Sequence, residues 1–337
     1  MQYTPYATLS SSLFLDQVSG MWTGVLCGLL AGAMWGMVFI VPELLSAFSP
    51  VELAVGRYTA YGAIALGLML PRLNGLLARL VRSDVAALLR HALAGNIVYY
   101  ILLALGVKLA GVAPTSLIIG VLPIAVTLMG RKDHGAAPLR ALALPLVVVA
   151  LGIACINLDV FQQAQLGDAR PGRILLGVVC ATGALLCWSW YTVDNARFLK
   201  RNAHFSSAEW SALYGLASGI IAVLIGLVGL AFWHGDILGA AGAASGRNWT
   251  VFWITNGLLA LGASVIGNHL WNIASRRVPV TLSGQLILFE TLFALLYGFI
   301  SMQRLPRPLE IGAVVLLTVG VMWSVRVHAS DNEVIPA

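Results

Sequence analysis

Glu290 is the residue whose type and position most directly suggest chemistry. It lies midway along the apolar segment 279–301, so a membrane-crossing helix over this segment places its carboxyl group near the bilayer centre. An ionised carboxylate there costs about 2.5–3.5 kcal/mol, which favours a position in the protein interior. Two interpretations follow. The carboxyl group binds substrate or carries protons, or it is neutral or paired and holds its helix against a neighbour.

Two groups of polar and aromatic residues share helical faces. Asn96, Tyr99 and Tyr100 stand at i, i+3 and i+4 of one apolar segment, and Trp188 and Tyr191 form a similar face in another. Aromatic residues near helix ends often belong to the membrane interface, but the Asn96 amide needs a hydrogen-bond partner in lipid. These faces are candidates either for the interfacial belt or for the lining of a substrate cavity.

Three further polar or helix-breaking residues lie inside apolar segments: His269, Arg57 and Pro123. His269 is a candidate substrate ligand, with a hydrogen-bonded packing role as the alternative. Arg57 is close enough to a predicted helix end for its side chain to reach the headgroups. Pro123 would free a backbone carbonyl and kink its helix, and such breaks often lie near the substrate path of transporters.

The composition identifies the kind of protein that must position these residues. Of 337 residues, 59% are hydrophobic and 10% are charged, and the mean hydropathy is +0.87. Because soluble chains carry about 25% charged residues, most of this surface must face lipid. The net charge of +6 comes from basic residues in short connections, which does not indicate a nucleic-acid partner. The four cysteines have no ligand spacing, so we expect neither a disulfide nor a metal site.

Long apolar segments predict an all-α, polytopic membrane protein. With about twenty residues per crossing, the sequence contains ten such segments: 22–41, 52–70, 91–107, 112–129, 141–158, 174–193, 210–233, 250–273, 279–301 and 309–325. Residues 1–20 form a polar N-terminal tail, and residues 328–337 form a C-terminal tail. About two thirds of the Lys and Arg residues fall on one side of these crossings, which predicts that both termini are cytoplasmic.

An internal repeat relates the two halves of the chain. The segment Gly24–Trp35 aligns without gaps to Gly177–Trp188, with Gly, Val, Cys, Ala and Trp shared at matching positions. Because five helices are an odd number, the two copies must be inverted relative to each other, as is typical of transporters that bind substrate at the bilayer midplane. We predict a first repeat at 21–158, a linker at 159–173 and a second repeat at 174–327.

The repeat adds Trp35 to the candidate site, and the first predicted helix also contains a stripe of glycines. Trp35 is the repeat mate of Trp188, and the alignment sets Pro123 opposite Glu290. In the first predicted helix, glycines recur every fourth residue from Gly24 to Gly36. Such a stripe allows another helix to approach closely, and it would also permit sliding between conformations.

Four short motifs resemble the EamA-type members of the drug/metabolite transporter superfamily: Ala33–Gly36, Gly56–Tyr58, Leu122–Pro123 and Phe289–Glu290. The resemblance covers residues 21–327 and implies a carrier of the bacterial inner membrane with two five-helix repeats. It also implies a central cavity and the export of small metabolites. The chain departs from the family pattern at Thr291, where proline often follows the glutamate, and at the ends of helices four and nine.

The function predicted from these features is secondary transport by alternating access. We expect a small amino-acid-like or amphipathic substrate, a lipid-embedded monomer or homodimer, and no cofactor. The sequence has no phosphate-binding loop for a primary pump. A membrane-embedded enzyme or a scaffold is the alternative, and the enzyme would need clusters of His, Asp or Glu near the headgroups. The sequence leaves the substrate open.

Overall fold

The regular structure of the described residues is entirely helical. The computed structural model describes residues 6–39, 41–45, 47–110, 115, 118–163, 171–232, 247–301 and 303–334. The longest uninterrupted helices are α1 (Tyr6–Gly36), α3 (Pro50–Met69), α9 (Leu139–Gln163), α10 (Pro171–Arg201), α11 (Ser207–Phe232) and α16 (Pro308–Val334). Their apolar side chains form one continuous core, and many other leucines and valines are exposed, as a lipid-facing surface requires.

Eight helical segments within the described residues are long and apolar enough to cross a membrane: Pro50–Arg79, Arg82–Gly106, Leu139–Asp159, Gly172–Arg201, Ser207–Gly229, Trp249–Arg277, Val280–Ser301 and Pro308–Ser330. They correspond to eight of the ten predicted helices. The first predicted helix is represented by the shorter apolar stretch Gly20–Gly36. The fourth is represented by α8 (Leu122–Gly130), and part of its first half lies outside the described residues. The count of ten crossings therefore stays a prediction.

Both terminal tails are more helical than predicted. Helix α1 begins at Tyr6 rather than near residue 20, because the stretch from Tyr6 to Ser19 contains no glycine or proline that would interrupt a helix. Helix α16 continues to Val334, and its His328 is buried against Thr281, with 2.7 Å between the His328 Nε2 and Thr281 Oγ1 atoms. Of the predicted linker 159–173, residues 164–170 lie outside the described part.

Three of the predicted membrane helices are interrupted. In the third, a π-helical turn η3 (Ala92–Val98) separates α5 (Arg82–His91) from α6 (Tyr99–Ala110). In the eighth, a second π-helical turn, η5 (Ala260–Ile266), separates α12 (Trp249–Leu259) from α13 (Gly267–Arg277). The ninth is broken at Ile287 into α14 (Val280–Leu286) and α15 (Leu288–Ser301). Such turns are frequent at functional sites because they free backbone groups from the regular ladder.

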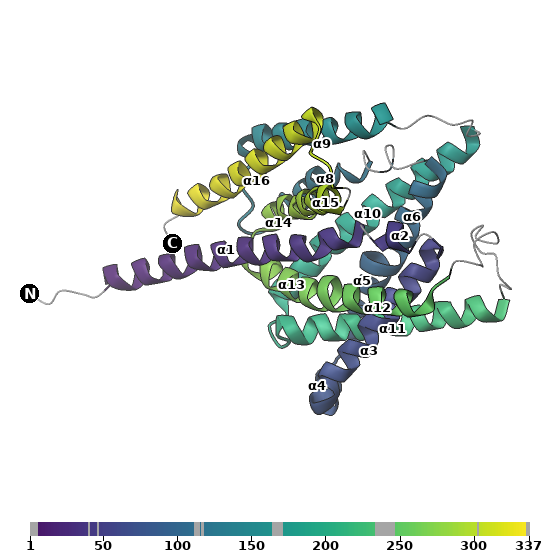
Figure 1. Cartoon of the computed structure of the whole chain (residues 1–337). Helices are drawn as coiled ribbons and strands as arrows, with labels where there is room; N and C mark the ends of the chain where they lie inside the picture. Colours follow the sequence, from purple (N-terminus) through teal and green to yellow (C-terminus); the bar gives the residue numbers. More distant parts are fainter. Residues whose placement is uncertain are drawn as a thin grey trace, which may run out of the picture.

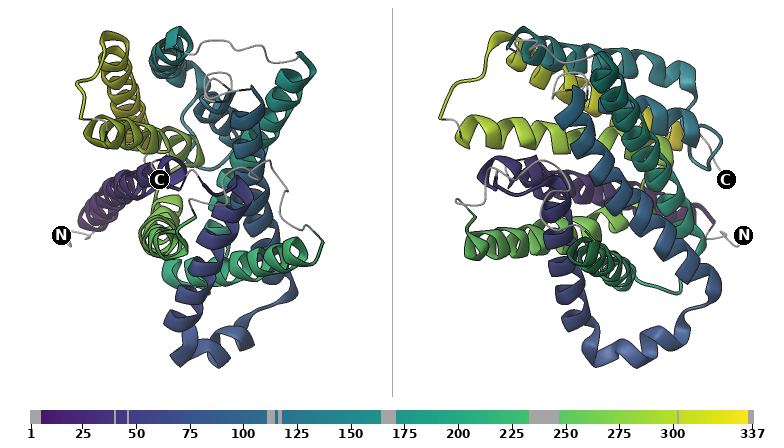
Figure 2. Two further views of the ribbon diagram at one scale, coloured as in Figure 1. Left: turned by 45° about the vertical axis from the view of Figure 1, so that its right-hand side comes forward. Right: turned by 90° about the vertical axis from the view of Figure 1, so that its right-hand side faces the viewer.

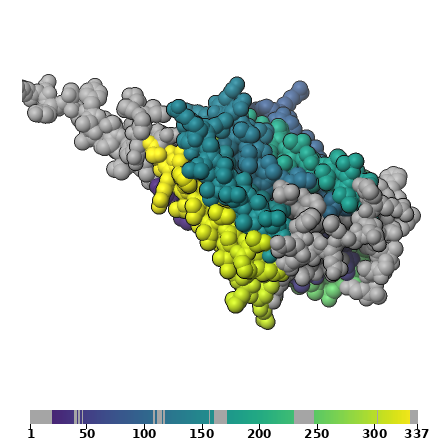
Figure 3. Space-filling model, turned by 90° about the horizontal axis from the view of Figure 1, so that it is seen from above, coloured from purple at the N-terminus to yellow at the C-terminus, as the bar shows by residue number. Residues whose placement is uncertain are grey.

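The helices pack in pairs that join the two halves of the chain. Helix α16 lies along α9 (Figure 1), and the space-filling view shows the yellow helix beside the teal one (Figure 3). Helix α3 packs on α11 so closely that a methyl group at Gly62 would lie 2.7 Å from the Gly219 Cα atom. Helix α1 packs on α13 and α15, and α10 packs on α6 and α8. The short helix α4 (Leu73–Arg79) projects from the bundle after α3 (Figures 1 and 2).

The glycine stripe of α1 is a close-packing surface, as predicted. A methyl group at Gly28 would lie 2.9 Å from the Leu286 Cδ1 atom. At Gly32 it would lie 2.6 Å from the Phe289 Cβ atom and 2.8 Å from the Glu290 amide nitrogen. At Gly32 the neighbouring atoms include backbone, so a side chain there would require the backbone to shift. The stripe therefore brings α1 against the broken ninth helix at the position of Glu290, and whether it also slides stays a prediction.

Candidate functional site

Aromatic rings from four helices meet in the middle of the bundle. We call Trp35, Tyr99, Trp188, Tyr191 and Trp271 the central aromatic cluster. The ring centroids of Trp35 lie 5.8 Å from those of Trp188 and 5.2 Å from those of Trp271. Trp188 stacks on Tyr99 at 4.8 Å and lies 5.2 Å from Tyr191. These separations are those of favourable ring pairs, each of which adds about 0.5–1.5 kcal/mol beyond area burial.

Further tyrosines extend the cluster toward α3 and α11. Tyr191 stacks on Tyr214 at 5.6 Å, and Tyr214 in turn lies 6.4 Å from Tyr61. The Tyr61 hydroxyl donates to the Ser211 carbonyl oxygen at 2.6 Å, and it accepts a 3.3 Å hydrogen bond from the Asn268 side-chain amide. Tyr61 is therefore fixed between three helices. Hydropathy does not predict that Tyr61 is buried in the protein, because an aromatic side chain is equally compatible with lipid and with the protein interior.

Tyr100 is also part of this extension, on the side of Arg57. The Tyr100 ring lies 6.4 Å from the Tyr58 ring in an edge-on arrangement. Both residues are buried, and the Arg57 guanidinium stands 5.2 Å from the Tyr58 ring centroid. The predicted face of Tyr99 and Tyr100 thus points at aromatic rings and a cation in the protein interior.

Arg57 is buried, so the interpretation that it reaches the headgroups is wrong. Its side chain is 8% exposed, and its Nε atom donates to the Ser264 hydroxyl in the π turn η5 at 3.2 Å. Glu290, which carries the opposite charge, lies on α15, and α15 packs on α1. Among the described residues, however, no Arg57 nitrogen lies within 4.0 Å of a Glu290 oxygen. The two opposite charges therefore form no direct ion pair.

Glu290 lies in the first turn of α15 rather than in the middle of a continuous helix. The preceding break at Ile287 follows Ser283, whose hydroxyl donates to the Val280 carbonyl oxygen at 2.7 Å. Serine hydroxyls that bond the local backbone compete with the regular helical ladder, which gives a physical reason for the irregularity. The first N–H groups of a helix have no partner within it and favour a nearby negative charge. The break thus places Glu290 at the start of a helix rather than inside one.

The side-chain amide of Asn96 has the hydrogen-bond partner that a polar group in an apolar segment requires. It is 6% exposed and donates to the Ser218 hydroxyl of α11 at 2.7 Å. The preceding residue, Gly95, is packed so tightly that a methyl group there would lie 2.6 Å from the Tyr191 ring. The π turn η3 therefore touches the central aromatic cluster, and Asn96 anchors that turn to α11.

The second π turn, η5, also supports the cluster. The Trp35 indole donates to the Ala263 carbonyl oxygen at 2.9 Å. The Trp271 indole nitrogen is buried without a hydrogen-bond partner among the described residues. A buried indole N–H normally finds an acceptor, so Trp271 leaves one donor available in the cluster.

Two predicted site residues lie apart from the others. His269 is half-buried, its Nδ1 atom has no partner, and no hydrogen bond or ring contact within the described residues joins it to the cluster. Pro123 faces α14: its carbonyl oxygen accepts from the Thr127 hydroxyl at 2.8 Å and would lie 3.3 Å from a methyl group at Gly284. Pro123 therefore packs on the segment before the break rather than on the segment that carries Glu290.

Polar contacts tie the C-terminal part of α10 to its neighbours. Arg197 forms an ion pair with Asp133 at 2.9 Å, and Lys200 donates to the Val278 carbonyl oxygen at 2.6 Å. Deeper along α10, the fully buried His91 lies 2.8 Å from the Asp194 carboxylate. These contacts hold the bundle together at one end.

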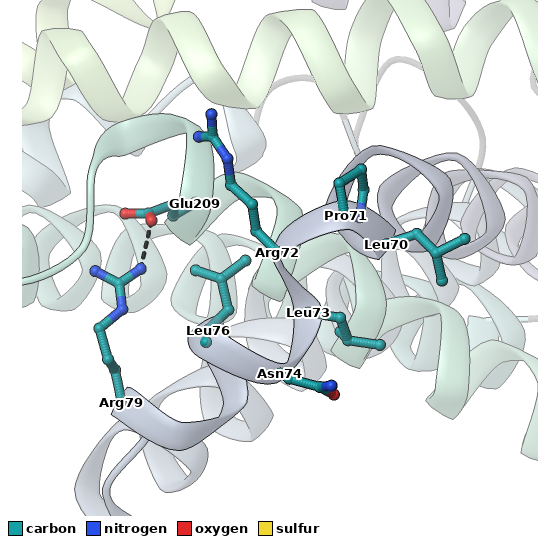
Figure 4. Close-up of a pocket in the computed structure, with 9 residues that line it drawn as sticks. Leu70, Pro71, Arg72, Leu73, Asn74, Leu76, Arg79 and Glu209 are labelled. Atoms are coloured by element: carbon teal, nitrogen blue, oxygen red, sulfur yellow. Dashed lines mark hydrogen bonds and ion pairs between the residues drawn. The ribbon is translucent and has the colours of Figure 1, made fainter.

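Hollows in the described surface lie away from the cluster. One follows α3 and is lined by residues of the segment Leu70–Arg79 and by Glu209 (Figure 4). Another runs along α16 between Thr318 and Ser330. Within the part of the chain that the structure describes, no three His, Cys, Asp or Glu residues are grouped so that they could hold a metal ion.

The fold and these sites define a multi-pass, all-helical membrane protein. The chain is 32% identical over 309 residues to the inner membrane protein YtfF of Escherichia coli (strain K12), which covers 90% of this chain and 95% of that protein. The chain therefore belongs to the family of this inner membrane protein.

Solved structures support the fold alone. A crystal structure that carries no functional description superposes with a TM-score of 0.69 and 19% sequence identity, covering 89% of this chain and 96% of that one. No family model matches the chain. Membership of the EamA-type transporters therefore stays a prediction.

Proposed function

We propose that this protein is a secondary transporter of the inner membrane, related to the EamA-type carriers, which exports a small metabolite by alternating access. The observation that carries the proposal is the arrangement of Arg57 and Glu290. Arg57 of α3 lies beside the Tyr58 ring, and Glu290 begins α15, which packs on α1, the helix of Trp35; among the described residues the two side chains form no direct ion pair. Buried charges are costly when unpaired, so a bound molecule that bridges them would be strongly favoured.

The chemistry of the three components suggests the class of substrate. A guanidinium binds a carboxylate or another anionic group. A carboxylate binds an ammonium group, and the faces of Tyr99 and Trp188 favour cations or flat apolar groups. An amphipathic molecule with at least one charged group, such as an amino-acid-like metabolite, satisfies all three.

The internal repeat supports alternating access. The same sequence spacing that relates Trp35 to Trp188 also relates Tyr61 to Tyr214. Each of these residues lies beside its own mate, with ring centroids 5.8 Å and 6.4 Å apart. Two copies related by a two-fold axis bring equivalent residues together only near that axis. Both the third and the eighth predicted helix also contain a π turn. These features favour an inverted repeat with the cluster on its axis, which is where transporters of this kind bind substrate.

The experiment first identifies the substrate and then removes the charge of Glu290. Comparing the metabolites of cells that lack the protein with those of cells that overproduce it gives a candidate substrate, and flux is then measured in proteoliposomes. We expect Glu290→Gln to reduce flux at least about tenfold, or to remove its dependence on pH, since the amide keeps the shape but cannot ionise or pair with a cation.

Glu52→Gln is the matched control. Glu52 is a carboxylate that caps α3 and pairs with Arg247, outside the cluster, so its amide variant should keep wild-type flux. If Glu290→Gln shows the wild-type rate and pH profile at equal protein level, Glu290 only holds helices together and the proposal fails. If no substrate flux depends on the protein at all, a membrane-embedded enzyme or a scaffold becomes the better explanation.

A further inference from the structure

We call the connection from the end of α3 through α4 the elbow. It contains a surface groove that lies outside the proposed transport site. Helix α3 ends at Met69, a short 3-10 turn η2 follows at Leu70–Arg72, and α4 comes next. The groove between α4 and the start of α11 has a volume of about 810 Å³. Figure 4 shows that Arg72, Leu76 and Arg79 point from the elbow toward Glu209 of α11.

One end of the groove is basic. Arg79 is occupied: it forms an ion pair with Glu209, donates to the His204 carbonyl oxygen at 3.0 Å and lies 5.1 Å from the Phe205 ring centroid. Arg72 is exposed and has no hydrogen-bond or ion-pair partner within the described residues. Since Glu209 is the one acid among the lining residues and already neutralises Arg79, Arg72 leaves the groove with one uncompensated positive charge.

The other end of the groove is apolar. Leu70, which lines it together with Pro71, is 65% exposed. Directly before it on α3, Leu66 and Leu68 are 40% and 63% exposed. Because α3 belongs to a membrane-crossing segment, these leucines lie where acyl chains approach the protein surface. The groove thus changes from apolar to basic along its length, from the membrane-crossing helix toward α11.

We infer that this groove binds an anionic phospholipid, with the phosphodiester on Arg72 and the acyl chains along the exposed leucines of α3. A phosphodiester carries one negative charge, which matches the single uncompensated charge of the groove. Arginine binds phosphate oxygens through two parallel N–H donors, and basic pockets beside transmembrane helices are suited to lipid headgroups. The apolar end distinguishes this ligand from free phosphate or a polar metabolite, neither of which would use the leucines.

The test compares two arginines of equal charge and similar exposure. Arg72 lines the groove, whereas Arg82 is exposed at the start of α5 and does not line it. The full-length wild type, Arg72→Gln and Arg82→Gln are purified in detergent and titrated with phosphatidylglycerol or phosphatidylcholine. Bound lipid is then counted by native mass spectrometry. We expect Arg72→Gln to weaken phosphatidylglycerol binding at least about tenfold, because the charge-assisted hydrogen bonds to the phosphate are lost, and Arg82→Gln to weaken it much less.

Three results would overturn the inference. Equal losses in the two variants would mean that the basic elbow attracts anionic lipid diffusely. Equal binding of the two lipids to the wild type would mean that the headgroup charge is not recognised. Displacement of phosphatidylglycerol by millimolar inorganic phosphate would identify a phosphate site instead. Thermal unfolding of both variants should match the wild type, because neither arginine is buried.

Discussion

Helices α1 and α10 begin the two halves of the chain with the same motif, yet they pack in different ways. In α1, glycine stands at every fourth position and touches the backbone of the broken ninth helix at Phe289 and Glu290. In α10, the equivalent positions hold Gly177, Ala181, Leu185 and Ser189. The first still packs tightly, since a methyl group at Gly177 would lie 2.5 Å from the Ala110 amide nitrogen. At the level of Gly32, however, α10 carries a leucine.

The difference shows that two segments with a shared sequence motif can pack by different contacts. Close approach to a helix backbone is possible where the side chain is a hydrogen atom, and only α1 has one at this level. That interface carries Glu290. The interactions at the C-terminal ends of α1 and α10 differ as well. The end of α1 accepts one hydrogen bond, from the Tyr297 hydroxyl to the Ala33 carbonyl oxygen at 3.0 Å, whereas α10 ends in ion pairs.

The largest expected effect comes from replacing Gly32 of α1 with leucine, the residue at the equivalent position of α10. Gly32→Leu should destabilise the protein by about 3 kcal/mol or more, because the new side chain meets backbone atoms that cannot move aside. Thermal unfolding in detergent and the protein level in the membrane measure the loss. The matched control is Gly20→Leu, at a glycine of the same helix with nothing within 4 Å of an added methyl group. Equal behaviour of the two variants would show that α1 and α10 do not differ in packing.

An intermediate effect separates the two repeat-related tryptophans. Trp35→Phe removes the hydrogen bond to the Ala263 carbonyl oxygen in a buried π turn, which should cost about 1 kcal/mol in addition to the lost ring contacts. Trp188 makes only ring contacts among the described residues, so Trp188→Phe should cost less. Unfolding midpoints of the two variants give the comparison. A larger loss for Trp188→Phe would mean that stacking, rather than the π turn, holds the cluster.

The hydropathy of the chain predicted which segments are helical but not where they break. Segment length alone locates a crossing, because the apolar core of a bilayer has a fixed thickness. The π turns at Ala92–Val98 and Ala260–Ile266 and the break at Ile287 coincide with no proline. They are stabilised by bonds to other helices, such as the one from Trp35 to Ala263. Contacts of this kind have no signature in the local sequence.

The candidate site was predicted in part, for a related reason. The sequence predicts that Glu290 lies within a membrane-crossing segment, which agrees with the apolar helical segment Val280–Ser301, but it does not predict the direction in which a side chain points. Arg57 was assigned to the headgroups because it lies near a predicted helix end, whereas its helix turns it toward Ser264. Trp271 and Tyr58 were missed because nothing in the sequence separates an interior ring from one that faces lipid. His269 was included by type alone, and no contact in the described part joins it to the cluster.

The smallest expected effect is at the end of α10, where charge takes the place of close packing. Arg197 and Asp133 are half-buried and 2.9 Å apart. Pairs that reach solvent contribute about 0.2–1 kcal/mol and weaken as salt screens them. A double-mutant cycle of Arg197→Ala and Asp133→Ala, read from unfolding in detergent, should give a coupling below about 1 kcal/mol that shrinks from low to high salt. The Gly32→Ala variant of α1 should lose the same stability at every salt concentration, because steric contact is not screened. A coupling of several kcal/mol that does not change with salt concentration would show that the Arg197–Asp133 pair is shielded from solvent. In that case α1 and α10 would both be held by buried contacts.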